Sequence, residues 1–252
     1  MTADSLPSLL RSLGLGVMVR EHEVAVARAE KENWGYQKFL HYLAEEEVND
    51  KQARRIQRLL KDSNLPKTET LERLSLAKMP EKVRRMLPTL LTGEFVARGD
   101  NLIAMGLHGR GKTGFCAAVG RALVERHQLK VLFIPTFKLV SQLLAAKRDL
   151  RLPEALARLN RYDLIHVDEL SYVTQNRDEV DVLFNFFAER YEKQRSVIVT
   201  ASLVFSQWDK IFKDAMTAAA VVDRLVHRAI LLEFPGKSIR AEEAEAKQRQ
   251  AT

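Results

Sequence analysis

The octapeptide "GLHGRGKT", residues 106–113, directly follows the apolar run of residues 102–105. Its spacing, with four residues between the first and last glycine and then a lysine and a threonine, is that of a P-loop. In such a loop backbone N–H groups cradle phosphates, the lysine reaches the β- and γ-phosphates, and the threonine hydroxyl ligates Mg²⁺. The alternative is an ordinary glycine-rich turn. The motif predicts a nucleotide-binding loop made by Gly106, Gly109, Arg110, Gly111, Lys112, Thr113 and Gly114.

The residues around the motif have the pattern that a P-loop requires. Residues 101–105 form a candidate buried strand, and "FCAAVGRALVER", residues 115–126, is apolar at helical spacing without proline. Strand and helix patterns alternate from residue 76 onward, and the strands are apolar runs, which are typical of strands buried on both faces. The pattern predicts an α/β fold with a parallel sheet flanked by helices. Further candidate strands are 131–134, 163–168, 196–201 and, more weakly, 229–234.

The first 75 residues have a different character. Residues 6–19 are apolar and predict a short helix, residues 21–33 are charged and alanine-rich, and "YQKFLHYLAEEEVNDKQARRIQRLLKDS" carries apolar residues at helical spacing. "NLPKTET" then marks a boundary, because Pro66 breaks the helix. We expect a small all-helical module over 1–75, the α/β domain over 76–240 and a charged tail, a frayed helix or disorder, over 241–252.

Composition narrows the class of protein. The chain has 252 residues and a single cysteine, Cys116, which excludes an intrachain disulfide and a cysteine-based zinc site and suits a reducing cytosol. We expect Cys116 to be a small core residue. The N-terminus lacks the apolar region of a signal peptide, and no segment approaches 18 uninterrupted apolar residues. The sequence therefore predicts a cytoplasmic protein with no membrane partner.

Positive charge is concentrated in one part of the chain. The net charge is +7, and residues 76–160 carry 15 basic against 6 acidic side chains, whereas residues 1–75 carry 12 of each. Nucleic acid is the natural partner of such a surface, and solubility is the alternative explanation. The helical module adds a basic stripe at steps of three and four, which is either a solvated face or a phosphate contact. The stripe consists of Lys51, Arg54, Arg55, Arg58 and Lys61.

A second signature, "LIHVDEL" at residues 164–170, indicates what happens to the nucleotide. It places Asp168 at the carboxyl end of an apolar strand, beside the P-loop, where its carboxylate can hold Mg²⁺. Glu169 can then polarise a water for in-line attack on the γ-phosphate. ATP hydrolysis is the leading interpretation of the pair. We expect His166 to be buried and neutral, with one hydrogen bond.

Two more positions are candidates for catalysis. The strand "SVIVTAS" ends in residues 200–202, where a polar side chain could bind the attacking water or the γ-phosphate. "VVDRLVHR" places Arg224 before the last strand, where it could stabilise transition-state charge on a neighbouring subunit's nucleotide. An ion pair with Asp223, or a surface position, is the alternative for Arg224.

These motifs together resemble the IstB family, AAA+ ATPases that assist the transposases of certain insertion sequences and are related to the DnaC helicase loader. The resemblance covers about residues 6–240, and its most specific parts are "AAKRDLRLPEALARLNRYDLIHVDEL" and "AERYEK". It implies an AAA+ core without a C-terminal helical lid, ATP and Mg²⁺ as cofactors, ATP-dependent self-association on duplex DNA, and an IstA-like transposase as partner.

The resemblance also implies roles for individual residues. Lys112 and Thr113 hold phosphate and Mg²⁺, Asp168 and Glu169 form the Walker B pair, and Arg224 is the arginine finger. The segment of residues 136–159 corresponds to extra helix that lines the DNA path in related proteins, although cations at a helix C-terminus are also favoured by the helix dipole. Basic residues of this segment expected to contact DNA are Lys138, Lys147, Arg148 and Arg151, with Arg54, Arg55 and Arg58 of the stripe.

Two departures from the family pattern bear on the rate of hydrolysis more than on ATP binding. The usual "GPPGVGKTHLA" is here "GLHGRGKTGFC", and the usual asparagine after the fourth strand is Ser202. The serine mildly favours a non-hydrolysing, ATP-gated DNA scaffold as an alternative function. A DnaC-like helicase loader is a second alternative, because its ATPase core would be identical and only the partner of the N-terminal module would differ. A P-loop kinase is disfavoured, because nothing like an acceptor-binding lid follows the Walker B segment.

Overall fold

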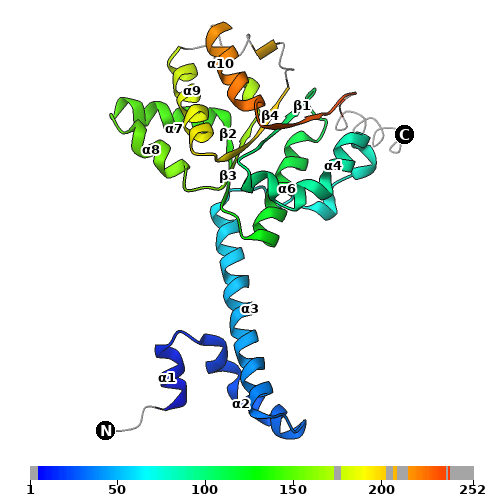
Figure 1. Ribbon diagram of the computed structural model, residues 1–252, viewed down its shortest axis with the longest axis vertical. Helices are drawn as coiled ribbons and strands as arrows, with labels where there is room; N and C mark the ends of the chain where they lie inside the picture. Colours follow the sequence, from blue (N-terminus) through cyan, green and yellow to red (C-terminus); the bar gives the residue numbers. More distant parts are fainter. Residues whose placement is uncertain (1–4, 173–176, 203–206, 209–214, 237, 239–252) are drawn as a thin grey trace, which may run out of the picture. The chain divides into compact units, whose positions relative to one another are not determined.

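The computed structural model contains two compact units, Met1–Arg58 and Leu59–Thr252 (Figure 1). It describes residues 5–172, 177–202, 207–208, 215–236 and 238. The division falls after Arg58 and not at the expected boundary after residue 75. The reason is that apolar residues of the intervening segment, including Leu65, Leu71 and Leu74, pack into the core of the second unit. The predicted tail, 241–252, lies outside the described residues.

The first unit is all-helical, as expected. It contains α1 (Leu6–Ser12), α2 (Gly16–Lys31) and most of α3 (Tyr36–Asp62). The predicted helix over 6–19 is wrong in one respect: it is interrupted at Gly14, whose φ of 68° is left-handed and ends α1.

A carboxylate far along the chain caps α2. Glu47 of α3 is buried, and its Oε2 accepts hydrogen bonds from the backbone N–H groups of Val17 (2.7 Å) and Met18 (3.2 Å). Its Oε1 lies 3.6 Å from Nζ of Lys51 and 3.8 Å from a guanidinium nitrogen of Arg54. Burial alone would raise the pKa of Glu47, but the two N–H groups and Lys51 stabilise the carboxylate and lower its pKa below the usual value.

The second unit is built on the predicted parallel sheet. Its strand order is β2-β3-β4-β1-β5, and every pairing is parallel. Each strand lies within one residue of the range expected from its apolar run. The strands are β1 (Asn101–Met105), β2 (Val131–Pro135), β3 (Leu164–Asp168), β4 (Ser196–Ala201) and β5 (Ala229–Glu233).

Helices cover both faces of this sheet (Figure 1). One face packs against α4 (Glu81–Leu91), α5 (Glu94–Ala97) and α6 (Lys112–His127), together with the 3₁₀ turns η1 (Leu71–Arg73) and η2 (Leu76–Lys78). The other packs against α7 (Thr136–Arg148), α8 (Leu152–Leu159), η3 (Leu170–Tyr172), α9 (Arg177–Glu192) and α10 (Ala215–Val226). Within the described part of the chain, each helix is too short or too polar to cross a membrane.

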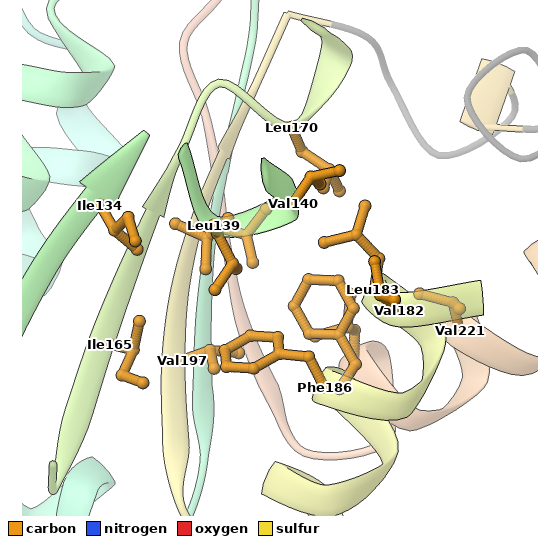
Figure 2. Packing of buried hydrophobic residues seen from close by; sticks show 14 of the residues in the cluster. Ile134, Leu139, Val140, Ile165, Leu170, Val182, Leu183, Phe186, Val197 and Val221 are labelled. Carbon is orange, nitrogen blue, oxygen red and sulfur yellow. The ribbon is translucent and has the colours of Figure 1, made fainter. Parts of the chain in front are cut away.

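The layers are held by apolar side chains that alternate along the strands. Figure 2 shows Leu139 of α7 and Phe186 of α9 packed over Ile165 and Val197 of the sheet. Cys116 of α6 is a fully buried core residue, as expected, and burial raises the pKa of its thiol far above the usual value.

The buried side chain of Arg190 forms hydrogen bonds at the amino ends of β3 and β4. The guanidinium of Arg190, on α9, donates to the carbonyl oxygens of Tyr162 (2.8 Å), Asp163 (3.2 Å) and Ser196. Burial lowers its pKa to about 9, which leaves the group charged at neutral pH. The bonds connect the segment before β3 to the start of β4, so they fix where both strands begin.

The strand register brings the carboxyl ends of β1, β3 and β4 together. Asp168, the last residue of β3, pairs with Pro135 of β2, and Val167 pairs with Val199 of β4. Met105, the last residue of β1, pairs with Ala201. The P-loop, the Walker B pair and the end of β4 therefore meet at one edge of the sheet.

We predict that Glu47→Gln lowers the stability of the first unit by about 2 kcal/mol at pH 7, because hydrogen bonds to a charged carboxylate are lost. The folded-state pKa is depressed, so the contribution is complete above the unfolded pKa of about 4.3 and is lost as the pH falls through the folded value. Amide hydrogen exchange over α2 should show a difference from wild type at pH 7 that begins to shrink below the unfolded pKa of about 4.3 and disappears once the pH is below the depressed folded pKa. The exposed Glu45→Gln is the control, and a pH-independent difference would contradict the cap.

Candidate nucleotide-binding and hydrolysis site

The P-loop follows β1 and ends where α6 begins at Lys112. Gly106 has a φ of 145°, and a Cβ at this position would collide with the carbonyl oxygen of Phe234. Gly111 has a φ of 83° and precedes the helix as its N-cap. Both positions require glycine, and the loop leads directly into a helix N-terminus, whose free N–H groups favour an anion.

Lys112 carries its charge inside the loop. The side chain is buried, and its Nζ donates to the carbonyl oxygens of Gly106 (2.6 Å) and Leu107 (3.0 Å). A buried ammonium is costly unless it meets acceptors or an anion. Phosphate oxygens are stronger partners than carbonyls, because the hydrogen bond is then charged on both sides. The loop therefore fits a phosphate chain.

Asp168 is the centre of the hydrogen-bond network beside the loop. Its Oδ1 accepts a hydrogen bond from the hydroxyl of Thr113 (2.8 Å) and another from the hydroxyl of Thr200 (2.7 Å). Its backbone carbonyl accepts a third, from the hydroxyl of Thr136 (2.8 Å). A carboxylate and a hydroxyl in contact are the oxygen donors that Mg²⁺ prefers, so Thr113 and Asp168 fit the ion expected with a nucleotide.

Glu169 lies next to this network in an unusual backbone conformation. Its φ of 56° is left-handed, and its N–H donates to the hydroxyl of Thr200 (2.8 Å). Its Oε2 lies 3.8 Å from Nδ1 of His108 in the P-loop, a contact that the sequence did not indicate. Its Oε1 is buried and has no hydrogen-bond partner among the described residues. That oxygen is therefore able to accept a hydrogen bond from a water.

A cavity of about 580 Å³ joins the P-loop to the Walker B pair. Its walls include Lys112, Thr113, Asp168 and Glu169. The remaining wall comes from the segment before α4, which carries no recognisable motif and which the sequence had marked only as a domain boundary. Cavity residues from that segment are Pro66, Glu69, Arg73, Leu74, Ser75 and Met79.

That wall is held against the start of α6 by two contacts. The guanidinium of Arg121 donates to the carbonyl oxygens of Pro66 and Glu69, each at 3.2 Å. The carboxylate of Glu69 lies over Gly114, where a Cβ would be 2.6 Å from its Oε2. A side chain at position 114 would therefore require the Glu69 carboxylate to move.

His166 is buried and neutral, as predicted, but the expected hydrogen bond is wrong. Burial lowers its pKa to about 4, even though the nearby Asp168 opposes that shift. Neither ring nitrogen has a hydrogen-bond partner among the described residues, and Nε2 lies 3.7 Å from Oδ1 of Asp168. The ring packs edge-on against Phe133, with centroids 4.9 Å apart, so packing holds this side chain.

Two predicted catalytic residues lie apart from the cavity. Neither Ser202 nor Arg224 is among the described residues that line it. The backbone N–H of Ser202 donates to Oγ of Ser171 (3.0 Å). The guanidinium of Arg224 lies 5.0 Å from the ring centroid of Phe184 and donates to the carbonyl of Ala220 (3.0 Å).

The candidate DNA contacts differ in their surroundings. Nζ of Lys147 lies 2.8 Å from Asp178 and 3.6 Å from Asp181, both on α9, which an inspection of residues 136–159 alone could not reveal. These pairs raise the pKa of Lys147. Arg148 and Arg151 are exposed at the turn between α7 and α8, and Lys138 lies beside the ring of Phe137. In the first unit Arg54 pairs with Asp50, while Arg55 and Arg58 are exposed.

Sequence comparison identifies relatives over almost the whole chain. The family model of IstB-like ATP binding proteins matches residues 8–247. A Pseudomonas aeruginosa protein of insertion sequence IS21, named for ATP binding, is 32% identical over 238 residues, which are 94% of this chain and 89% of the relative. A similarly named insertion-sequence protein of Sinorhizobium fredii is 37% identical over 218 residues, or 86% and 72% of the two chains.

Solved structures with a similar fold come from replication initiation. The DnaC helicase loader has a TM-score of 0.52 at 18% identity over 61% of this chain and 89% of its own. The replication initiator DnaA, bound to AMPPCP and single-stranded DNA, has a TM-score of 0.58 at 15% identity over 74% and 56%. At these identities the likeness concerns the fold alone. With the match over residues 8–247, the chain belongs to the family of IstB-like ATP binding proteins.

Proposed function

We propose that this protein is a Mg²⁺-dependent ATPase that assembles on duplex DNA when it binds ATP and assists a transposase. The observation that carries the proposal is the convergence of Lys112, Thr113, Asp168 and Glu169 on one cavity. The group combines a phosphate-binding cation, two metal-binding oxygens and a carboxylate with a free oxygen, as phosphoryl transfer to water requires.

Each residue has a defined part in the proposed reaction. Lys112 would hold the β- and γ-phosphates, and Thr113 and Asp168 would hold Mg²⁺, which when bound neutralises phosphate charge. Glu169 would orient the attacking water and accept its proton through Oε1. As the water oxygen bonds to the γ-phosphorus, the bond from that phosphorus to the bridging oxygen breaks and ADP leaves. The part of the wall that comes from residues 66–79 would exclude water from its side of the cavity.

The assembly part of the proposal rests on Arg224. Arg224, on α10, is not among the described residues that line the cavity of its own chain. Its guanidinium lies over the ring of Phe184, on α9. We propose that it acts in a neighbouring subunit, where a guanidinium can stabilise the charge that develops on the γ-phosphate.

The choice of a transposase over a replicative helicase as partner rests on the sequence relatives. Those described above belong to insertion sequences, whereas the DnaC likeness, at 18% identity, concerns the fold alone. In a pull-down from defined components, an IstA-like transposase should be retained, and a replicative helicase should not. Retention of the helicase alone would favour the loader alternative.

We predict that Glu169→Gln retains ATP binding but lowers steady-state phosphate release at least about 100-fold, because it removes the proton acceptor and keeps the metal ligands. Lys112→Ala should instead abolish ATP binding, since the phosphates lose their buried cation. Fluorescent ATP titration and phosphate release, each with and without DNA, separate the two effects. A Glu169→Gln variant as fast as wild type would make that carboxylate structural, and no phosphate release by wild type would support the non-hydrolysing scaffold.

We predict that Arg224→Ala lowers hydrolysis only in the assembled protein, because an arginine acting in trans cannot help an isolated subunit. Mixing it with Lys112→Ala is the test: the wild-type Arg224 of a subunit that cannot bind ATP should restore phosphate release by its neighbour. Absence of rescue at every mixing ratio would remove the intersubunit role.

We predict that Arg148→Ala combined with Arg151→Ala weakens binding to unrelated duplexes and flattens the salt dependence by about two ions, because phosphate contacts are lost. Lys147→Ala is the matched control, and its smaller effect follows from its pairing with Asp178 and Asp181. ATP affinity should stay unchanged. If the double variant keeps the wild-type affinity and salt slope, DNA binds elsewhere, with Arg55 and Arg58 as the next candidates.

A further inference from the structure

Thr200 makes two bonds at the centre of the site although no motif singles it out. It is fully buried near the end of β4. Its hydroxyl donates to Oδ1 of Asp168 (2.7 Å) and accepts the backbone N–H of Glu169 (2.8 Å). The register explains this position, since the pairing of Val167 with Val199 places the next residues of the two strands, Asp168 and Thr200, side by side.

In these two bonds the Thr200 hydroxyl is both a donor and an acceptor, which no apolar side chain can be. A hydroxyl has one hydrogen to donate and lone pairs to accept. Because the hydrogen goes to the Asp168 carboxylate, the lone pairs face the N–H of Glu169. The bond to that N–H fixes the peptide that precedes Glu169. Glu169 itself has a left-handed φ of 56°, which is unfavourable for a non-glycine residue.

We propose that Thr200 is a positioning residue for ATP hydrolysis, which holds Glu169 in its left-handed conformation and ties it to Asp168. This inference rests on the proposed ATPase function. In this inference the functional polar side chain at the end of β4 is Thr200, which acts through Asp168 and Glu169. Ser202, the residue expected in that place, is not among the described residues that line the cavity. Thr200 also holds Asp168 independently of Thr113, whose hydroxyl is the one needed by Mg²⁺.

Isosteric substitution gives a direct test. Thr200→Val keeps the volume but removes both bonds, and Thr200→Ser keeps the hydroxyl. We expect Thr200→Val to lower kcat about 10- to 100-fold while the ATP Kd changes by less than about threefold, since contacts that orient a functional group typically have effects of this size. Thr200→Ser should restore kcat to within about threefold of wild type.

A control and a second variant separate positioning from general loss of structure. Ser196→Ala removes a buried hydroxyl at the other end of the same strand and should leave kcat unchanged. If Thr200→Val does not bind ATP, Thr200→Ala, which leaves room for a water, replaces it in the comparison. A kcat equal to wild type in a variant without the hydroxyl, or a serine variant as slow as the valine variant, would overturn the proposal.

A double-mutant cycle asks whether Thr200 acts through Glu169. In single-turnover phosphate release, adding Thr200→Val to Glu169→Gln should lower the residual rate no further, because the group being positioned is already lost. Independent, multiplying losses would overturn the proposal. Absence of hydrolysis by wild type would instead refute the ATPase function itself, so the two failures are distinguishable.

Discussion

A single carboxylate oxygen, Oδ1 of Asp168, connects the ends of two strands to the start of α6, and the site depends on this connection. It accepts the hydroxyl of Thr113 from the start of α6 and the hydroxyl of Thr200 from β4, while Asp168 itself ends β3. The bond to Thr200 forms only when β3 and β4 pair in the observed register. Because one residue of slippage would turn Asp168 to the other face, the register of a buried parallel sheet is what brings Asp168 beside Thr200.

The site keeps features that stability alone would not select. Lys112 is a buried cation held by loop carbonyls, Glu169 has a left-handed backbone and a buried carboxylate oxygen, and His166 is buried beside Asp168. Each costs free energy, which the apolar packing on both faces of the sheet offsets; Figure 2 shows the packing on one of them. All three lie on or beside the residues that would bind ATP and water, so strain and function coincide.

The sequence predicted the sheet, the P-loop and the Walker B pair closely, because apolar runs and glycine spacing are local signals. It missed the wall of residues 66–79, the approach of His108 to Glu169 and the pairing of Lys147 with α9, because these depend on segments far apart in the chain. Thr200 offered a weak signal, a polar residue ending an apolar strand, but only the register shows what it bonds. The division between the units was misplaced because residues 59–75 pack with the second core.

The most direct test of this account is an experimental structure of the protein with AMPPCP and Mg²⁺. The account predicts the triphosphate inside residues 106–113, with Nζ of Lys112 moved from the carbonyls of Gly106 and Leu107 onto phosphate oxygens. It also predicts the Thr113 hydroxyl on the metal ion and Thr200 still bonded to Asp168 and Glu169. A nucleotide bound elsewhere, or Lys112 still bonded to its own loop, would contradict it.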